Sequence, residues 1–219
     1  MVIRYSSNDR YELVEIDRPE SRGALDKEHL LLLKRCLDQI HLDRPLILTG
    51  CGDSFCSGLD LKEVAKMSNE EKKEINISFA SLLTQISQLR NLSIVFVNGP
   101  CVGGGCGIAA AANYTVVSSS ARFKCPELSI GLAPAQIYPY LKRRITNEAN
   151  LLRFLSGQWI SANEAISSGI AHECDTKNMS LWASERLSVI EDLFAFSHNI
   201  SNYDPQDHVK LSEIFINNE

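Results

Sequence analysis

Two glycine-rich segments have the residue types to hold an anion with backbone amides alone. Residues 54–63 read SFCSGLDLKE, and residues 98–107 read NGPCVGGGCG. We expect each segment to end a buried strand and to begin a helix, where glycine allows a sharp turn and a close approach of a ligand to the main chain. The first N–H groups of a helix lack intrahelical partners, and the helix dipole adds positive potential. Two such helix starts that converge would stabilise a carbonyl oxygen that becomes negative during a reaction.

Other interpretations of the second segment stay open on these residues alone. A glycine run also occurs where a helix packs tightly on a strand, or where a helix start holds a phosphate. The dinucleotide-binding pattern G-x-G-x-x-G is not matched, because Gly103 and Gly105 fit its first two glycines but Ile108 stands at the third. The Gly-Lys-Ser/Thr sequence of a P-loop does not occur in the chain either.

The hydrophobic pattern predicts the elements that must position these turns. Expected strands occupy residues 2–5, 11–16, 46–49, 94–97, 114–118 and 122–124, and expected helices occupy residues 25–40, 59–67 and 68–89. Asp26 is the expected N-cap of the first helix. We expect the chain to be helical from residue 149 onward. Strands that alternate with helices predict a layered α/β core followed by a helical tail.

The composition narrows the classes of function. The chain has 219 residues, of which 44% are apolar and 22% are charged, as in one compact α/β domain. Its formal net charge of −5 does not favour binding to nucleic acid or to anionic lipid. The sequence lacks the apolar run of about 18–20 residues that a membrane helix needs, and it lacks the features of a signal peptide. We therefore expect a cytoplasmic protein without a membrane partner.

Two further groups of residues predict no binding site of their own. The basic run at residues 142–144 is expected to be a solvated helix face, with a phosphate contact as the alternative. The seven cysteines are an odd number without a repeating framework, so we expect free thiols. Because the pairs Cys51/Cys56 and Cys101/Cys106 have no neighbouring histidine, we expect no metal site.

Five segments, in order, resemble the conserved boxes of the crotonase (enoyl-CoA hydratase/isomerase) superfamily. The segments are residues 18–25 (RPESRGAL), 54–63 (SFCSGLDLKE), 98–107 (NGPCVGGGCG), 123–132 (FKCPELSIGL) and 160–171 (ISANEAISSGIA). The resemblance implies a spiral of stacked ββα turns over residues 1–175. It also implies that residues 176–219 form a shortened helical tail that serves as a lid or in oligomer contacts. The implied assembly is a homotrimer or a dimer of trimers.

The resemblance also implies the chemistry of the site. The backbone amides of Leu59 and Gly104 stand at the positions that form the family's oxyanion hole. Ser57, Asp60 and Gly103 belong to the same boxes and are expected to contact the substrate. The substrate would be a thioester of coenzyme A or of an acyl-carrier protein, whose phosphopantetheine belongs to the substrate, with no separate cofactor. The two amides would polarise its carbonyl and stabilise an enolate.

Only one of the family's two carboxylates is present. In the enoyl-CoA hydratases the first acid stands where this chain has Gly107, and the second stands where it has Glu127. We therefore predict that Glu127 alone acts as the general acid or base. Without the resemblance, a cap or an ion pair in the following turn would be the favoured role of Glu127. Relatives with only the second acid include enoyl-CoA isomerases, in which one base moves a proton between two carbons, so we expect a hydratase, dehydratase or isomerase of this kind.

The segment at residues 130–145 resembles members that act on branched acyl groups. These members include the dehydratases of polyketide β-branching. The resemblance places Ala133 and Gln136 near the acyl pocket, although ordinary turn and core residues would have the same types.

Several rivals to this interpretation remain within or near the same fold. A decarboxylase or a thioesterase would use the same oxyanion stabilisation, and a non-catalytic member would bind the thioester without turnover. A Clp-type serine protease needs a Ser-His-Asp set, but no serine follows the glycine run. A cysteine hydrolase would need a histidine partner for Cys106 or Cys125, and the sequence offers no recognisable one.

Overall fold

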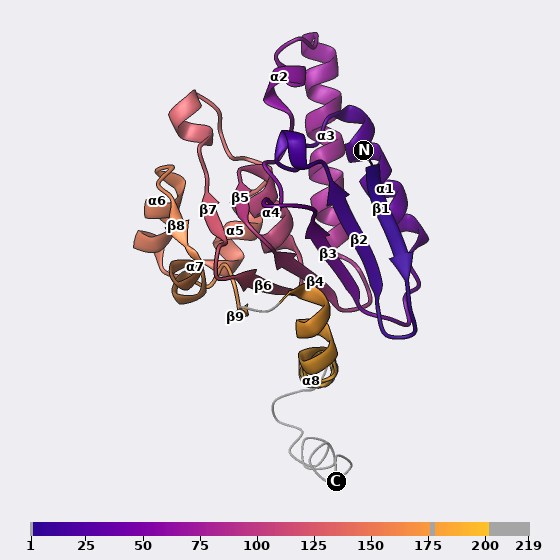
Figure 1. Ribbon diagram of the computed structural model, residues 1–219. Coiled ribbons are helices and arrows are strands. Elements are labelled where there is room, and N and C mark those ends of the chain that lie inside the picture. Colours follow the sequence, from indigo (N-terminus) through magenta and orange to yellow (C-terminus); the bar gives the residue numbers. More distant parts are fainter. Residues whose placement is uncertain (1, 176–177, 202–219) are drawn as a thin grey trace, which may run out of the picture. The chain divides into compact units, whose positions relative to one another are not determined.

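A computed structural model describes residues 2–175 and 178–201 (Figure 1). The strands are β1 (Val2–Ser7), β2 (Glu12–Asp17), β3 (Leu46–Gly50), β4 (Ser93–Val97), β5 (Pro100–Val102), β6 (Tyr114–Ser118), β7 (Arg122–Lys124), β8 (Ile160–Ser161) and β9 (Glu173–Asp175). The helices are η1 (Pro19–Ser21), α1 (Lys27–Gln39), α2 (Leu61–Val64), α3 (Asn69–Ser87), α4 (Gly104–Ala111), η2 (Glu127–Ile130), α5 (Tyr138–Arg144), α6 (Glu148–Leu155), α7 (Ala162–Ser168) and α8 (Met179–Ser201).

The larger sheet has six strands in the order β1-β2-β3-β4-β6-β9. β1 and β2 form an antiparallel hairpin, and every later pair in this sheet is parallel. The central strands β3 and β4 are buried along their whole length, as the continuous apolar runs at these positions predict. α1 packs on β1 and β2, and α3 packs on both α1 and α4, so helices cover the sheet on the side that Figure 1 shows behind the strands.

The smaller sheet has the order β5-β7-β8, and it explains the spiral. A parallel bridge between Cys56 and Cys101 adds the segment after β3 to the edge formed by β5. Each turn of the chain thus contributes one strand to the larger sheet and one extended segment to the smaller sheet before a helix begins. β4, β5 and α4 form one such turn, and β6, β7 and η2 form the next. This arrangement confirms the expected α/β class with stacked ββα turns.

Local capping explains where several helices begin. The side chain of Asp26 accepts the His29 amide at the start of α1, as predicted. Ser68 and Glu71 form a reciprocal capping box at the start of α3. α3 is therefore helical from its first turn, although its polar sequence left a loop possible there.

Two expectations about secondary structure were wrong in part. The chain after residue 149 is not purely helical, because the short strands β8 and β9 complete the two sheets. Strands of two or three residues carry too little alternation to be detected by periodicity. The helix expected over residues 59–67 is only the single turn α2, since Leu59 takes part in a bridge to Leu25 and Asp60 is the N-cap.

The described residues fall into two compact units that divide at residues 179 and 180. The site residues all lie in the first unit. α8 is a helix of 23 residues, and residues 176–177 and 202–219 of the expected tail lie outside the described part of the chain. The proposed boundary at residue 175 and the lid role of the tail stay predictions. No helix within residues 2–175 and 178–201 has the length and apolar character needed to cross a bilayer.

Candidate active site

The two glycine-rich segments meet at Gly58 and Gly104. A Cβ atom added to Gly58 would lie 2.6 Å from the backbone N of Gly104 and 3.0 Å from its Cα. Gly58 also has φ +80°, a conformation that side chains disfavour. No residue except glycine fits at position 58, and the contact brings the neighbouring Leu59 close to the start of α4.

The Leu59 amide points away from its strand partner. Leu25 donates its N–H to the Gly58 carbonyl at 2.7 Å and accepts the Asp60 N–H at 2.9 Å. In a parallel bridge of this kind, the residue between the two bonded neighbours directs its own N–H to the opposite side. Among the described residues, the Leu59 amide has no hydrogen-bond acceptor. Its N–H is therefore available to a ligand.

The Gly104 amide is available for a different reason. Gly104 is the first residue of α4, so its N–H has no acceptor within the helix. The sequence-based explanation thus holds for Gly104 but is wrong for Leu59. Leu59 precedes Asp60, the N-cap of α2, and it is presented by a bridge rather than by the first turn of a helix.

The carboxylate of Glu127 lies against the start of α4. A Cβ atom on Gly103 would lie 3.0 Å from Glu127 Oε1, and Gly103 has φ +54°. Glu127 begins η2, directly after Pro126. Its Oε2 atom is buried and finds no hydrogen-bond partner in the described part of the chain. A buried carboxylate oxygen without a partner is costly, and such an atom is typical of a functional group that awaits a proton or a substrate.

An apolar wall lies beside Gly107, the position of the family's first acid. A Cβ atom on Gly107 would lie 2.3 Å from Ile137 Cγ2 and 3.4 Å from Leu83 Cδ1. A Cβ atom on Gly104 would lie 2.6 Å from Cζ of Phe79. Sequence reasoning missed Phe79 and Ile137. The signal for Ile137 was Gly107 itself, because a glycine in the middle of a buried helix needs a neighbour to fill its space.

Ser57 and Asp60, two further predicted site residues, lie in the first glycine-rich segment. The Ser57 carbonyl oxygen would lie 3.9 Å from a Cβ on Gly103, and the Ser57 hydroxyl donates to the Ser21 carbonyl at 3.4 Å. The Asp60 side chain caps α2 by accepting two backbone amides. Asp60 therefore holds the segment in place, since its carboxylate is already engaged.

The loop before α5 carries the two residues predicted near an acyl pocket. Gln136 is half-buried, and its Nε2 donates to Asn76 Oδ1 of α3 at 2.9 Å. This bond ties the loop to α3. Ala133 is exposed, and no hydrogen bond of the described residues joins it to Glu127, Gly103 or Leu59.

Four buried cysteines surround the glycine turns as thiols. Cys101 Sγ and Cys106 Sγ are 3.8 Å apart, and the Cys106 thiol also donates to the Cys101 carbonyl. Burial and the negative charge of Glu127 raise the pKa of the Cys125 thiol. A thiol nucleophile needs a lowered pKa, so Cys125 is unsuited to a hydrolase mechanism. The fourth, Cys56, receives the Gly58 amide on its sulfur at 3.3 Å.

Arg144 caps the C-terminal end of α4, the helix whose start carries Gly104. Its guanidinium donates to the carbonyls of Ala110, Ala112 and Asn113. The expectation of a solvated face is therefore wrong for Arg144, which binds the unsatisfied carbonyls of a buried helix end. Burial of the guanidinium and, to a lesser extent, the charge of Arg143 together lower the pKa of Arg144 to about 10.

Arg144→Met should lower the free energy of unfolding by about 2–3 kcal/mol, because charged hydrogen bonds to buried carbonyls are lost. Lys142→Ala is the matched control, since Lys142 is exposed on the same helix. Urea unfolding of both variants measures the effect. Equal stability of the two variants would contradict the assigned cap.

His172 contacts Arg144 and is a titratable group next to the C-terminal end of α4. Its Nδ1 accepts the Thr115 amide at 2.9 Å, and its Nε2 lies 2.7 Å from Arg144 Nη1. Part of the ring is open to solvent, but each nitrogen faces a donor, which disfavours the doubly protonated ring. Burial and the charge of Arg144 lower the pKa of His172 to about 4.

The lowered pKa of His172 predicts a loss of stability in acid. Unfolding restores an ordinary pKa of about 6.5, so the unfolded chain binds this proton more readily. The stabilisation by neutral His172 is fully present above about pH 6.5 and is lost as the pH falls toward about 4. Unfolding of the wild-type protein and of His172→Gln at several pH values isolates the effect. The difference in the free energy of unfolding between the two proteins should shrink as the pH falls through this range. A difference that stays constant would refute the lowered pKa of His172.

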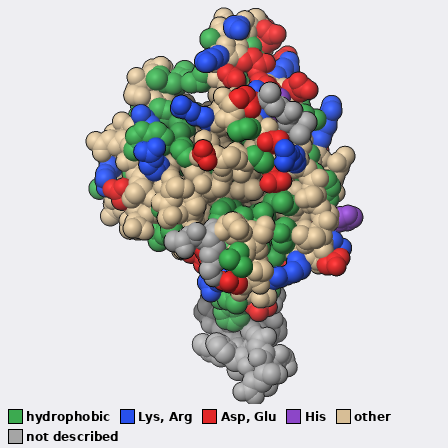
Figure 2. Space-filling model, in the orientation of Figure 1, with side chains coloured by type: hydrophobic (Ala, Val, Ile, Leu, Met, Phe, Trp, Pro, Cys, Tyr) green, Lys and Arg blue, Asp and Glu red, His purple; other side chains and the backbone are tan. Residues whose placement is uncertain are grey.

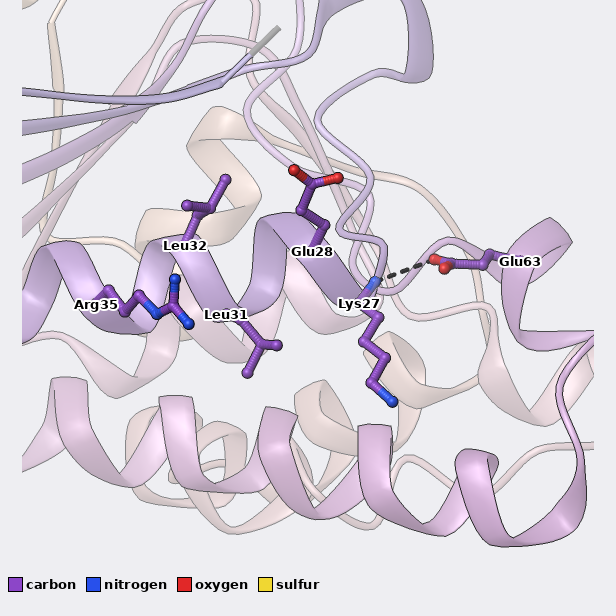
Figure 3. Close-up of a pocket in the computed structure, with 6 residues that line it drawn as sticks. All are labelled: Lys27, Glu28, Leu31, Leu32, Arg35 and Glu63. Atoms are coloured by element: carbon purple, nitrogen blue, oxygen red, sulfur yellow. Dashed lines mark hydrogen bonds between the residues drawn. The ribbon is translucent and has the colours of Figure 1, made fainter.

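A surface hollow lies away from these residues. It has a volume of about 430 Å³ and lies between α1 and α2 (Figure 3). The lining residues are Lys27, Glu28, Leu31, Leu32, Arg35 and Glu63, and the Lys27 amide donates to Glu63 at 3.1 Å. Two acidic and two basic side chains line this hollow, so their charges cancel. None of the predicted site residues lines it. On the face that Figure 2 draws, acidic and basic side chains are interspersed in the same way.

Comparison with known proteins gives the family. Residues 9–202 match the family described as enoyl-CoA hydratase/isomerase. The short-chain-enoyl-CoA hydratase of Clostridium acetobutylicum is 30% identical over 166 residues, which cover 74% of this chain and 64% of the relative. The crotonyl-CoA hydratase of Syntrophomonas wolfei is 31% identical over 130 residues, which cover 58% of this chain and 50% of the relative. The crystal structure of an enoyl-CoA hydratase from Bacillus anthracis has a TM-score of 0.81 at 23% identity, covering 97% of this chain and 88% of that one.

The stacked ββα turns and their structural neighbours define a crotonase fold. The chain belongs to the enoyl-CoA hydratase/isomerase family, since the match covers most of its length. The resemblance of the five segments to the crotonase superfamily is thereby confirmed. The chain spans 64% and 50% of the length of the two curated relatives described above.

Proposed function

We propose that the protein moves a proton within an enoyl thioester of coenzyme A, with Glu127 as the only carboxylic acid that takes part. The observation that carries the proposal is the buried, unpartnered Oε2 atom of Glu127 beside the start of α4. The amides of Leu59 and Gly104 supply the oxyanion hole on this proposal. The choice of coenzyme A rather than a carrier protein rests on the names of the curated relatives.

The proton transfer needs no other reactant. The carboxylate of Glu127 removes a proton from C2 of a 3-enoyl thioester, and the electron pair moves into the carbonyl to form a dienolate. The two amides stabilise its oxygen, a kind of stabilisation that typically contributes about 3–4 kcal/mol per donor. Glu127 then returns the proton to C4, which gives the 2-enoyl thioester and regenerates the carboxylate. Every atom of the substrate is kept.

The apolar wall beside Gly107 favours this reaction over addition of water. Two carboxylates position the water in the hydratases that the chain resembles. Here Ile137 fills the space beside Gly107, and its side chain can neither bind nor activate water. A single acid between two carbons of the substrate is sufficient for a proton shuttle.

The remaining site residues have supporting roles in the proposal. Ser57 and Gly103 line the thioester through their backbones, and Asp60 holds the Leu59 segment by capping α2. Gln136 and Ala133 are proposed at the acyl end of the site. The thioester brings its own phosphopantetheine, so the proposal needs no further cofactor. The homotrimer, or dimer of trimers, and the cytoplasmic location also stay predictions.

Deuterium exchange tests the proposed reaction. A panel of 2-enoyl, 3-enoyl and 3-hydroxyacyl thioesters, each on coenzyme A and on a carrier protein, is incubated with the protein in D2O. The proposal predicts deuterium at C2 and C4 of the enoyl-CoA thioesters. Exchange on the carrier-protein thioesters alone would overturn the choice of carrier, and dehydration of the 3-hydroxyacyl thioesters would indicate a dehydratase. Absence of exchange across the panel would favour a protein that binds the thioester without turnover.

A further inference from the structure

We infer that Phe79 and Ile137 restrict the site to short acyl chains, by closing the face of α4 along which the chain must run. The inference rests on the proposed function and adds the class of acyl group.

The direction of the acyl chain follows from the geometry of α4. On the proposed function the thioester oxygen binds between the Leu59 and Gly104 amides, and the reacting carbons reach Glu127, which lies beside Gly103. Gly103 is the N-cap of α4 and its carbonyl accepts the Gly107 amide, so Gly107 lies one turn further along the same face of the helix, about 6 Å along the axis. A chain that continues past the reacting carbons along this face therefore meets the space beside Gly107.

Ile137 closes that space. Its Cγ2 atom would lie 2.3 Å from a Cβ on Gly107, so the side chain is in direct contact with the helix backbone. Ile137 is only 3% exposed and is therefore held inside the protein. The branched side chain has few rotamers and leaves little freedom to move aside.

Phe79 closes the face nearer to the oxyanion hole. Its ring edge would lie 2.6 Å from a Cβ on Gly104, and the side chain is 3% exposed. Phe79 and Leu83 are four residues apart on α3, so they present one continuous apolar surface to α4.

The two halves of this wall are tied together. Asn76 lies one turn before Phe79 on α3, and its Oδ1 accepts Nε2 of Gln136, the residue before Ile137. Movement of the loop away from α3 would break this bond. The wall is thus a packed and anchored surface, and a long acyl chain would have to displace buried side chains.

Rates on a series of enoyl-CoA thioesters test the inference. We expect the wild-type protein to favour butenoyl-CoA over octenoyl-CoA by at least about tenfold in kcat/KM, because added methylenes in a closed apolar pocket change rates by about 10- to 200-fold each. Phe79→Leu and Ile137→Ala, which leave Glu127 and the two backbone amides in place, should each reduce or reverse this preference. Ile86→Ala is the matched control, since Ile86 is equally buried on α3 but lies about 10 Å further along the helix.

The outcomes separate the inference from the proposed function. Equal rates of the wild-type protein on butenoyl-CoA and octenoyl-CoA would overturn the inference and leave the proton transfer standing. An unchanged preference in both wall variants, with thermal unfolding that confirms folded protein, would also overturn it. Failure of every thioester in the series would instead count against the proposed function. Loss of the preference in Ile86→Ala as well would show that general loosening of α3, and not the wall, sets the chain length.

Discussion

Glu127→Gln should lower the rate of deuterium exchange into an enoyl-CoA thioester by about a thousandfold, within the range of 10²- to 10⁴-fold that general acid–base groups contribute. The amide has the shape of the carboxylate but cannot take up the substrate proton. The variant should nevertheless be at least as stable as the wild-type protein. Oε2 of Glu127 is buried without a partner, so the substitution breaks no hydrogen bond of that atom.

A control carboxylate separates this effect from a change of net charge. Glu148→Gln alters the charge equally at the start of α6, far along the chain from the site. It should leave exchange unchanged. Mass spectrometry of the thioester and thermal unfolding of both variants give the two readouts. Exchange by Glu127→Gln within tenfold of the wild-type rate would refute the role of Glu127.

Leu59→Pro should lower kcat by about 10²- to 10³-fold, the usual cost of removing one oxyanion donor. Proline removes the N–H of residue 59. The bridge to Leu25 should survive, because it uses the carbonyl of Gly58 and the amide of Asp60 and does not use the Leu59 amide. The lost rate would therefore report the donor and not the fold.

Leu59→Ala is the matched variant, since it trims the side chain and keeps the backbone donor. Its kcat should stay within about threefold of the wild-type value. Circular dichroism and thermal unfolding establish that both variants are folded. Similar rates for the proline and alanine variants would contradict a backbone oxyanion hole at this position.

The sequence predicted the parts of the site that depend on a local pattern. Gly103, Gly104 and Glu127 stand in boxes with a recognisable spacing, and the structure brings Glu127 Oε1 next to Gly103 at the start of α4. The hairpin of β1 and β2 and the cap at Asp26 were predictable for the same reason. In the hairpin and the cap the interacting residues are close in sequence, whereas Gly103 and Glu127, which are 24 positions apart (127 − 103), were paired by the resemblance to the crotonase boxes.

The parts that escaped prediction depend on contacts between distant segments. Whether the Leu59 amide is free depends on its bridge to Leu25, which lies 34 positions away in the sequence (59 − 25). Gly107 showed that an acid was missing, but only the fold brings Ile137 into the space beside it. The sequence predicted that Arg144 belongs to a solvated basic helix face, but its side chain donates to carbonyls at the end of α4. Charge and hydropathy at one position do not encode such partners.

One measurement tests most directly whether a single carboxylate moves a proton without adding water. The protein is incubated with a 2-enoyl-CoA and with its 3-enoyl isomer in D2O enriched in oxygen-18, and the products are followed by mass spectrometry. The account predicts interconversion of the two isomers with deuterium incorporation and without oxygen-18. Rapid formation of an oxygen-18-labelled 3-hydroxyacyl-CoA, at a rate equal to or above that of isomer exchange, would contradict it.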